Sequence, residues 1–231
     1  MPHHIVILTG AGLSAESGLG TFRDKGGLWE TNDLAKLATP EGFAEDPARV
    51  HAFYNARRDN AARAEPNPAH HALHHLSAQH EGRVTLITQN VDALHERAGS
   101  EDVIHMHGAL HGALCAACEH RYPAPPQMQA SDPCPNCGAP RTRPDIVWFG
   151  EIPYQMERIE GALLSADLFV AIGTSGSVYP AAGFVQLARA VGAQTLEINL
   201  DPSDVASDFD TATYGPASET VPAWVDQMLG S

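Results

Sequence analysis

The stretch Ile5-Val6-Ile7-Leu8-Thr9-Gly10-Ala11-Gly12-Leu13-Ser14-Ala15 decides the fold of this chain. An apolar, largely β-branched run is followed at once by two closely spaced glycines, which is the order of a buried parallel strand and a tight turn into a helix. Such glycines let the backbone approach a pyrophosphate, while the helix that follows offers N–H groups and a partial positive charge. The motif therefore predicts a dinucleotide site, and a glycine-rich turn without a ligand is the alternative.

Three further apolar runs repeat the pattern of the first strand, at 84–88, 168–172 and 195–199. Helical segments separate them, so the sequence predicts an α/β fold with a doubly wound, Rossmann-like parallel sheet. Polar or glycine-rich residues follow each strand, and ligands of open α/β sheets bind at that edge. The acidic residue expected about 20 positions after the glycine motif is not evident, which disfavours a hydride-transferring dehydrogenase.

Two segments, at about 24–78 and 110–144, interrupt this alternation. In the first segment we expect a helix with Asp46 as N-cap and Pro47 at its first position, and a second helix from Asn67-Pro68 to before Gly82. We expect the interruptions to form one smaller helical and zinc-binding domain, with a cleft between it and the sheet edge. The predicted dinucleotide-binding domain comprises 1–30, 79–109 and 145–231, and the small domain 31–78 and 110–144.

All four cysteines fall in the second interruption as two Cys-x-x-Cys pairs, which 15 residues separate. This spacing is typical of a tetrahedral four-thiolate zinc site, and a closed ligand set leaves no position for catalysis. Four reduced cysteines without metal are the alternative. The sequence thus predicts one structural zinc ion, bound by Cys115, Cys118, Cys134 and Cys137.

Composition narrows the class of protein. The 231 residues are 43% hydrophobic and carry a formal net charge of -14. Nucleic-acid binding needs clustered Lys and Arg, so neither nucleic acid nor a zinc-ribbon role on DNA is expected. No apolar run approaches the roughly 18 residues of a membrane span, and Met1-Pro2-His3-His4 is not a basic signal-peptide region. We expect a cytoplasmic protein with no membrane partner, and nothing requires an oligomer.

Ordered motifs along nearly the whole chain resemble those of the sirtuins, which are NAD-dependent protein deacylases, and the chain is most similar to the short bacterial (CobB-type) form. Gly20 departs from the pattern, because many members carry proline there. The motifs are 10–23 (GAGLSAESGLGTFR), 88–92 (TQNVD) with Leu94-His95 and 97–99 (RAG), His107-Gly108, the cysteine pairs, 144–151 (PDIVWFGE), 173–175 (GTS), 197–199 (EIN) and 215–218 (GPAS).

The resemblance implies that the enzyme consumes NAD. The acyl oxygen of an acyl-lysine attacks the ribose carbon that bears nicotinamide, and nicotinamide leaves. His107 then acts as general base on a ribose hydroxyl, which leads to free lysine and O-acyl-ADP-ribose; a histidine pKa near neutrality suits this role. Asn90 would orient the ribose and a water, and Asp92 would accept a hydrogen bond from the nicotinamide carboxamide. The remaining histidines, including His70, His71, His74 and His75, are expected to be solvated.

The resemblance also implies which residues contact the cofactor. Asn199 would bind the adenosine ribose in place of the missing acidic residue, Arg23 would contact phosphate or ribose, and Ala217 would pack near the adenine. The full set is Gly10, Ala11, Gly12, Ser14, Ala15, Thr21, Phe22, Arg23, Trp29, Gln89, Asn90, Asp92, Gly173, Thr174, Ser175, Asn199, Leu200, Asp201 and Ala217.

The segment Val147-Trp148-Phe149-Gly150-Glu151 matches the family's substrate-pairing strand, whose extended backbone would bind peptides with little sequence preference. Tyr54 and Arg57 lie three residues apart on one helix face, where a phenol and a guanidinium can hold a carboxylate. With the small Ala38 upstream, these residues resemble sirtuins that remove succinyl, malonyl or glutaryl groups. The alternative makes Tyr54 a core residue and Arg57 a surface ion-pair partner.

Three other functions remain as alternatives: a plain deacetylase, a mono-ADP-ribosyltransferase, and a module that binds NAD or ADP-ribose without chemistry. The joint presence of His107, Asn90 and Asp92 speaks against the last. We therefore expect a deacylase that acts on acylated lysine side chains of proteins, with NAD as co-substrate and one zinc ion.

Overall fold

The chain forms two β-sheets of unequal size, and this computed structural model describes residues 2–20 and 34–230. The larger sheet is parallel, with six strands in the order β3-β2-β1-β7-β8-β9, which is the arrangement of a doubly wound fold. Its strands are His4–Thr9 (β1), Arg83–Thr88 (β2), Ile104–His105 (β3), Leu168–Ile172 (β7), Gln194–Asn199 (β8) and Thr211–Tyr214 (β9).

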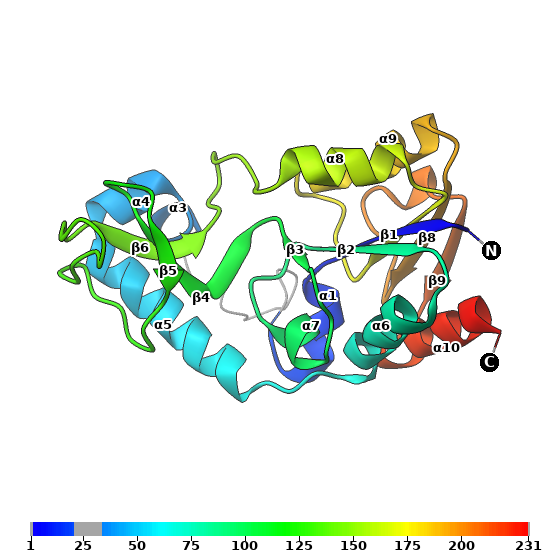
Figure 1. Ribbon diagram of the computed structural model, residues 1–231, viewed down its shortest axis with the longest axis horizontal. Coiled ribbons are helices and arrows are strands. Elements are labelled where there is room, and N and C mark those ends of the chain that lie inside the picture. The colour runs from blue at the N-terminus through cyan, green and yellow to red at the C-terminus, as the bar shows by residue number, and fades with distance from the viewer. Residues whose placement is uncertain (1, 21–33, 231) are drawn as a thin grey trace.

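Helices cover both faces of the large sheet (Figure 1). Because successive side chains of a strand point to opposite faces, Val6 and Leu8 pack against α8 and α9, while Ile5 and Ile7 pack on the side of α6 and α10. Each face therefore has its own apolar core. The bounds of these helices are Pro68–Gln79 (α6), Met156–Leu164 (α8), Phe184–Ala190 (α9) and Ala217–Leu229 (α10).

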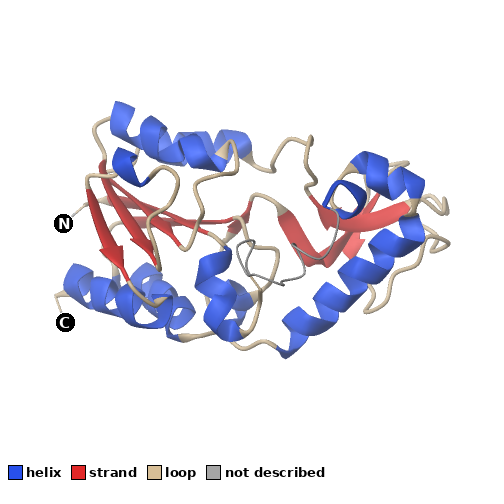
Figure 2. Ribbon diagram, turned by 180° about the vertical axis from the view of Figure 1, so that it is seen from behind, coloured by secondary structure: helices blue, strands red, loops and turns tan. Residues whose placement is uncertain are grey.

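The smaller sheet lies at the other end of the molecule and is antiparallel, in the order β5-β4-β6 (Figure 2). Helix α5 packs beside it, and Val50 and Tyr54 of that helix share a core with Leu110, Ile146 and Trp148. The elements here are Leu34–Leu37 (α3), Pro40–Glu45 (α4), Pro47–Arg63 (α5), Gly108–Cys115 (β4), Arg121–Pro123 (β5) and Thr142–Ile146 (β6).

The predicted helix starts are confirmed. The Asp46 carboxylate accepts a hydrogen bond from the backbone N–H of Arg49 at 2.9 Å, with Pro47 in the first turn of α5. Asn67 caps α6 in the same way, accepting from the N–H of Ala69 at 3.0 Å. Each side chain satisfies an N–H that a helix start leaves unpaired.

The fold class and the four apolar strands are confirmed, whereas β3 and β9 were not foreseen. Both are edge strands: β3 has only two residues, and every residue of β9 is exposed, so neither has an apolar run to announce it. The shorter elements are Ala11–Ser14 (α1), Leu94–Arg97 (α7) and the 3-10 turns Ala15–Ser17, Ala181–Gly183 and Ala206–Asp208.

Helix α6 lies with the large sheet, because its apolar face packs against α10 and against the core that contains Ile5 and Ile7. Strand β6 pairs with β4 in the small sheet. The division into two domains stays our proposal, and this packing places 68–79 with the dinucleotide-binding part and 145–146 with the small one. Within 2–20 and 34–230, no helix combines the length and the apolar character of a membrane span.

Candidate active site

The carboxyl ends of β1, β2, β7 and β8 open into a cavity of about 630 Å³ that continues to the small sheet. This is the edge at which open α/β sheets bind ligands. Thr21, Phe22, Arg23 and Trp29 lie outside the described residues. The other residues predicted for catalysis, cofactor binding or substrate binding all line this cavity, namely Gly10, Ala11, Gly12, Ser14, Ala15, Ala38, Tyr54, Arg57, Gln89, Asn90, Asp92, His107, Val147–Glu151, Gly173–Ser175, Asn199, Leu200, Asp201 and Ala217.

Three glycines bring two strand ends together at the floor of the cavity. A Cβ on Gly10 would lie 2.7 Å from the carbonyl oxygen of Gly173, and one on Gly12 would lie 2.8 Å from its Cα. Gly173 itself has a φ of +61°, and its Cβ would lie 2.4 Å from the backbone nitrogen of Leu13. No side chain fits between these two turns, so the glycines allow the turn after β1 and the loop after β7 to pack backbone against backbone.

The backbone N–H groups of this turn are used differently from what we expected. Those of Gly10 and Gly12 donate to the carbonyls of Ile172 and Gly173, at 2.9 and 2.8 Å, and that of Leu13 donates to Gly10. The expectation that the following helix offers unpaired N–H groups to a phosphate is wrong for Gly12 and Leu13 of α1. The bonds from Gly10 and Gly12 link the end of β1 to the end of β7, and the bond from Leu13 closes the turn itself.

Ser14, Asn90 and Asp92 form a buried polar network that joins β1 to the loop after β2. The Asn90 amide donates to the carbonyl of Gly10 and to the Ser14 hydroxyl, both at 3.1 Å. The Ser14 hydroxyl donates to the Asp92 carboxylate at 3.2 Å. Burial raises the pKa of Asp92, although the N–H of Leu94 and the Ser14 hydroxyl oppose this. The three predicted polar residues are thus fixed in one arrangement at the cavity wall.

His107 lies where the chain passes from the large sheet to the small one. Its Nδ1 lies 3.2 Å from the carbonyl oxygen of Gln89, which can only accept, so the neutral ring carries its proton on Nδ1 and its lone pair on Nε2. Burial lowers the pKa of His107, and the Gln89 carbonyl opposes that shift in part. A neutral imidazole in this tautomer is the form that a general base requires.

The position after His107 requires a glycine, Gly108. Its φ is +79°, and a Cβ there would lie 2.1 Å from the carbonyl oxygen of Asp145 on the neighbouring strand. The backbone of His107 then pairs with Val147, whose N–H donates to the His107 carbonyl at 2.9 Å. The histidine is therefore held between the two sheets.

The expectation that the other histidines are solvated is wrong for several of them. His70 is fully buried, with Nε2 lying 3.4 Å from the Ser14 hydroxyl, and its ring packs against that of His95 at 5.1 Å. Burial lowers the pKa of His70 to about 4 and that of His95 to about 3. His4 and His51 are also buried.

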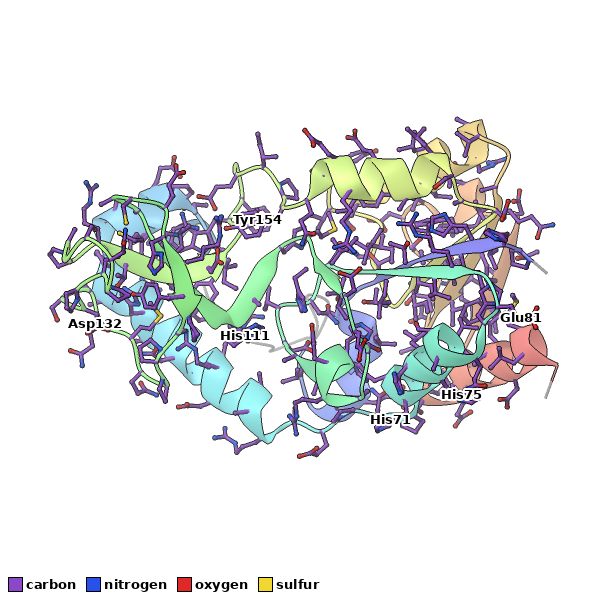
Figure 3. The ribbon with its side chains drawn as sticks, viewed as in Figure 1. His71, His75, Glu81, His111, Asp132 and Tyr154 are labelled. Carbon is purple, nitrogen blue, oxygen red and sulfur yellow. The ribbon has the colours of Figure 1, made fainter. Side chains whose placement is uncertain are left out.

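Helical spacing carried a signal for His70, since it lies three residues before the buried Leu73 on the face of α6 that packs on the sheet. His71 and His75, on the outer side of the same helix, are exposed as expected (Figure 3), and His74 is partly buried.

Side chains at the ends of three strands meet at the cofactor side of the cavity. The Gln89 amide donates to the Thr174 hydroxyl at 2.9 Å, and the Asn199 amide donates to the Thr174 carbonyl at 2.8 Å. Leu200 is exposed beside them, and the N–H of Ser218, next to Ala217, donates to Glu16. The predicted cofactor residues after β2, β7 and β8 therefore share one wall.

The acyl-pocket residues predicted from the sequence lie together at the other end of the cavity. Tyr54 is 1% exposed, and its hydroxyl accepts a hydrogen bond from the indole N–H of Trp148 at 3.0 Å. The Arg57 guanidinium carbon lies 5.9 Å from the centre of the Tyr54 ring, and Ala38 lines the same region. Burial lowers the pKa of Arg57, which the neighbouring Tyr54 and Asp92 oppose.

The segment 147–151 is not the extended strand that we expected. Strand β6 ends at Ile146, and the chain turns at Phe149 and Gly150, whose φ is +88°. The N–H groups of Trp148 and Phe149 already donate to Glu151 and to the carbonyl of Ala38. These bonds occupy two N–H groups of the segment, so the expected extended backbone is wrong, whereas peptide binding by these residues stays a prediction.

The four cysteines come together as predicted, with all their sulfur atoms within 4.8 Å of one another. Cys115 and Cys134 are buried, while Cys118 and Cys137 are exposed. Each pair ends in a tight turn, in which the N–H of Glu119 bonds the carbonyl of Cys115, and that of Gly138 bonds the carbonyl of Cys134, both at 2.8 Å. This donor set fits one tetrahedral zinc ion with a structural role.

Several lining residues were not predicted. Asn60 and Ala61 follow Arg57 on the same helix face, so the three- and four-residue spacing could have indicated them. Tyr179 and Val178 come from the loop after β7 and carried no pattern that pointed to the cavity. Arg143, on β6, does not line the cavity but stacks on the lining residue Trp148, and no sequence pattern indicated this contact.

Comparison with known proteins shows the family to which the chain belongs. The family model described as Sir2 family matches residues 10–180. An NAD-dependent protein deacylase of Caulobacter vibrioides is 57% identical over 97% of this chain and 96% of its own length, and one of Trypanosoma brucei brucei is 50% identical over 97% and 94%. A solved Sir2 homologue in complex with NAD superposes with a TM-score of 0.90 at 38% identity, over 98% of this chain and 89% of its own. On the strength of the matched motifs and of these relatives, the chain belongs to the Sir2 family.

Proposed function

We propose that the protein removes acyl groups from lysine side chains of proteins while it consumes NAD, and that it prefers acidic acyl groups, with deacetylation as a second activity. The observation that carries the proposal is that one continuous cavity is lined by the glycine turn, by His107 and by the Tyr54–Arg57 pair. NAD-consuming deacylation needs a dinucleotide, a base and an acyl group in contact, and this cavity has a suitable wall for each.

The cofactor side suits a dinucleotide, because Gly10, Gly12 and Gly173 line the cavity at the strand ends where open α/β sheets bind such ligands. When bound, NAD supplies the electrophilic ribose carbon from which nicotinamide departs. Asn90 and Asp92 would orient the nicotinamide half, and both are already held by Ser14. Their arrangement is preorganised, which lowers the cost of binding.

His107 would accept the proton of a ribose hydroxyl at its Nε2. The hydrogen bond from Nδ1 to the carbonyl of Gln89 orients the ring and stabilises the charged form as the proton arrives. Its lowered pKa keeps the base unprotonated at cellular pH. Tyr54 and Arg57 lie at the far end of the same cavity, where the acyl chain of a lysine would reach.

An acidic acyl group suits this far end because it matches the groups already there. Arg57 offers a charged, forked donor, and Tyr54 a hydroxyl donor, within a largely apolar wall. The small side chain of Ala38 leaves room for a longer acyl chain. An acetyl group carries no carboxylate that could bind Arg57 and Tyr54, so we expect it to be processed less efficiently.

The test compares kcat/KM for succinyl-, malonyl- and acetyl-lysine versions of one peptide. We expect Arg57→Met and Tyr54→Phe to lower kcat/KM for the succinyl peptide about 10- to 100-fold, since a hydrogen bond to a charged group is lost. Arg63→Met, at the exposed end of the same helix, is the matched control and should change neither activity. Equal losses of desuccinylation and deacetylation would refute the acyl preference.

A mono-ADP-ribosyltransferase would use the same cofactor bond, and a plain deacetylase the same base. Product analysis separates them, because a deacylase releases nicotinamide in step with peptide deacylation, whereas a transferase leaves ADP-ribose on protein. We further propose the cytoplasm as the location, since paired cysteines that bind metal suit a reducing compartment. We propose no nucleic-acid or membrane partner and no obligatory oligomer.

A further inference from the structure

The hydroxyl of Tyr54 is oriented by Trp148. The indole N–H of Trp148 points at the phenol oxygen from 3.0 Å, and both side chains are buried, at 2% and 1% exposure. An indole N–H can only donate, so the phenol oxygen must act as acceptor in this bond. The phenol proton is thereby left to donate to another group, and Tyr54 lines the cavity where an acyl chain would end.

Trp148 is in turn held by Arg143 and Glu151, and we call these three residues the tryptophan platform. The Arg143 guanidinium carbon lies 3.5 Å from the centre of the Trp148 ring. Its two terminal nitrogens donate to the two oxygens of Glu151, at 2.7 and 2.9 Å, and one of them also donates to the carbonyl of Ile146 at 2.7 Å. Glu151 completes the circle by accepting the backbone N–H of Trp148 at 2.8 Å.

The platform is rigid for a physical reason. Arg143 is 7% exposed, and a buried guanidinium that makes a forked pair with a carboxylate has one favourable orientation. Its flat face then fixes the plane of the indole ring, because a cation stacked on an aromatic face is most stable directly above it. The indole plane determines where the N–H points. It therefore determines the direction in which the Tyr54 hydroxyl donates its own hydrogen bond.

We propose that Arg143 is a positioning residue for acyl selectivity, acting through Trp148 to direct the Tyr54 hydroxyl proton at the carboxylate of an acidic acyl group. The inference rests on the proposed acyl preference and names the residues that support it from behind. Arg57 supplies the charge that attracts the carboxylate, and the tryptophan platform sets the direction of the second hydrogen bond. Arg143 touches neither substrate nor cofactor in this role.

The decisive experiment is a double-mutant cycle between Trp148→Phe and Tyr54→Phe, read as the ratio of kcat/KM for succinyl- to acetyl-lysine peptide. Trp148→Phe keeps an aromatic ring over Arg143 but removes the N–H donor. We expect it to lower the ratio about tenfold by raising KM for the succinyl peptide. In the Tyr54→Phe background, the same change should leave the ratio as it is, because the hydroxyl that Trp148 orients is gone.

Arg143→Lys tests the platform itself. Lysine keeps the charge but loses the flat face and the fork, so we expect the ratio to fall in the same direction, again without effect in the Tyr54→Phe background. The matched controls are Trp224→Phe on α10 and Arg158→Lys on α8, which make the same chemical changes far from the acyl pocket and should leave the ratio unchanged. Thermal melting of each variant reports whether it is folded.

Two outcomes would overturn the inference. The first is a ratio that stays at the parent value in both Trp148→Phe and Arg143→Lys, and the second is a change that adds to that of Tyr54→Phe. If the parent protein shows no succinyl preference, or if Arg57→Met leaves it intact, the proposed acyl preference fails instead. If Arg57→Met abolishes the preference while Trp148→Phe does not, only the role of the platform fails.

Discussion

The two ends of the cavity are built in different ways. At the cofactor end, Gly10, Asn90 and Gly173 each follow a parallel strand of the large sheet, and the lining residues lie on the loops directly after those strands. At the acyl end, Tyr54 comes from helix α5 and Trp148 from the segment after β6, and the wall is formed by interlocked side chains. The cofactor end depends on where the strands stop. The acyl end depends on packing between side chains far apart in the chain, such as Tyr54 and Trp148, which are 94 residues apart.

The difference teaches which part of the site should tolerate change. A strand end is fixed by the sheet ladder, so the cofactor end should keep its shape when the small sheet is disturbed. The acyl end has no such ladder behind it and depends on α5, β4 and β6 staying together. The following predictions separate the two ends, in order of decreasing effect.

Loss of the zinc site should destroy the acyl end and spare the cofactor end. Cys134 is buried in the four-thiolate cluster, so Cys134→Ser removes one ligand and should abolish zinc binding. Structural zinc contributes on the order of 10 kcal/mol to small folds, so its loss should disrupt the small sheet. We expect deacylation to disappear while ADP-ribose still binds. Zinc content and calorimetric ADP-ribose binding measure the two effects, and equal loss of both would contradict the contrast.

Removal of the base should affect every acyl group alike. His107→Ala deletes the imidazole that faces the cavity, and deacylation of succinyl and acetyl peptides should both fall by about 10²- to 10⁴-fold. NAD affinity should stay close to that of the parent, because Gln89 and Asn90 remain in place. Single-turnover peptide assays check this, and a loss confined to one acyl group would place His107 in the acyl end instead.

A methyl group at Gly173 should affect the cofactor end alone. The change Gly173→Ala sets a Cβ against the backbone of Leu13 at a positive φ, which costs roughly 1–3 kcal/mol. We expect KM for NAD to rise about tenfold, as that energy corresponds to such a factor. The ratio of succinyl to acetyl activity should not change. Gly161→Ala, where a Cβ meets open space on α8, is the control.

The buried histidines should make the fold sensitive to mild acid. In the unfolded chain a histidine has a pKa near 6.5, whereas the folded pKa of His70 is about 4 and that of His95 about 3. The unfolded state therefore holds more protons between these values, and stability present above pH 6.5 is lost as pH falls towards them. Each histidine contributes up to about 1.4 kcal/mol per pH unit.

Urea unfolding at several pH values between 7.5 and 5 measures this slope. His70→Asn and His95→Asn should each make it shallower, whereas His75→Asn, on the exposed side of α6, should leave it unchanged. A slope that stays the same in both buried variants would show that other groups cause the acid sensitivity. We expect this acid sensitivity to act at the cofactor end of the cavity, because His70 contacts Ser14 there.

Local sequence was sufficient for much of this protein. The apolar runs predicted the four central strands, Asp46 and Asn67 predicted two helix starts, and the cysteine spacing predicted the four-thiolate cluster. These features depend on neighbours in sequence or on covalently fixed spacing, which is why they can be read without a fold. The edge strands β3 and β9 could not, because short and exposed segments have no apolar period.

Tertiary structure alone decided the rest. His70 and His95 are polar by type but are buried where their rings pack together. The segment 147–151 turns, with the N–H of Trp148 bonded to Glu151 within the segment and that of Phe149 bonded to the carbonyl of Ala38. Trp148 contacts both Arg143 and Tyr54. Neither sequence separation corresponds to a helix or strand period, so the sequence did not indicate these contacts. Sequence periodicity reports which residues face inward, whereas the partner that each one meets there depends on how the elements pack together.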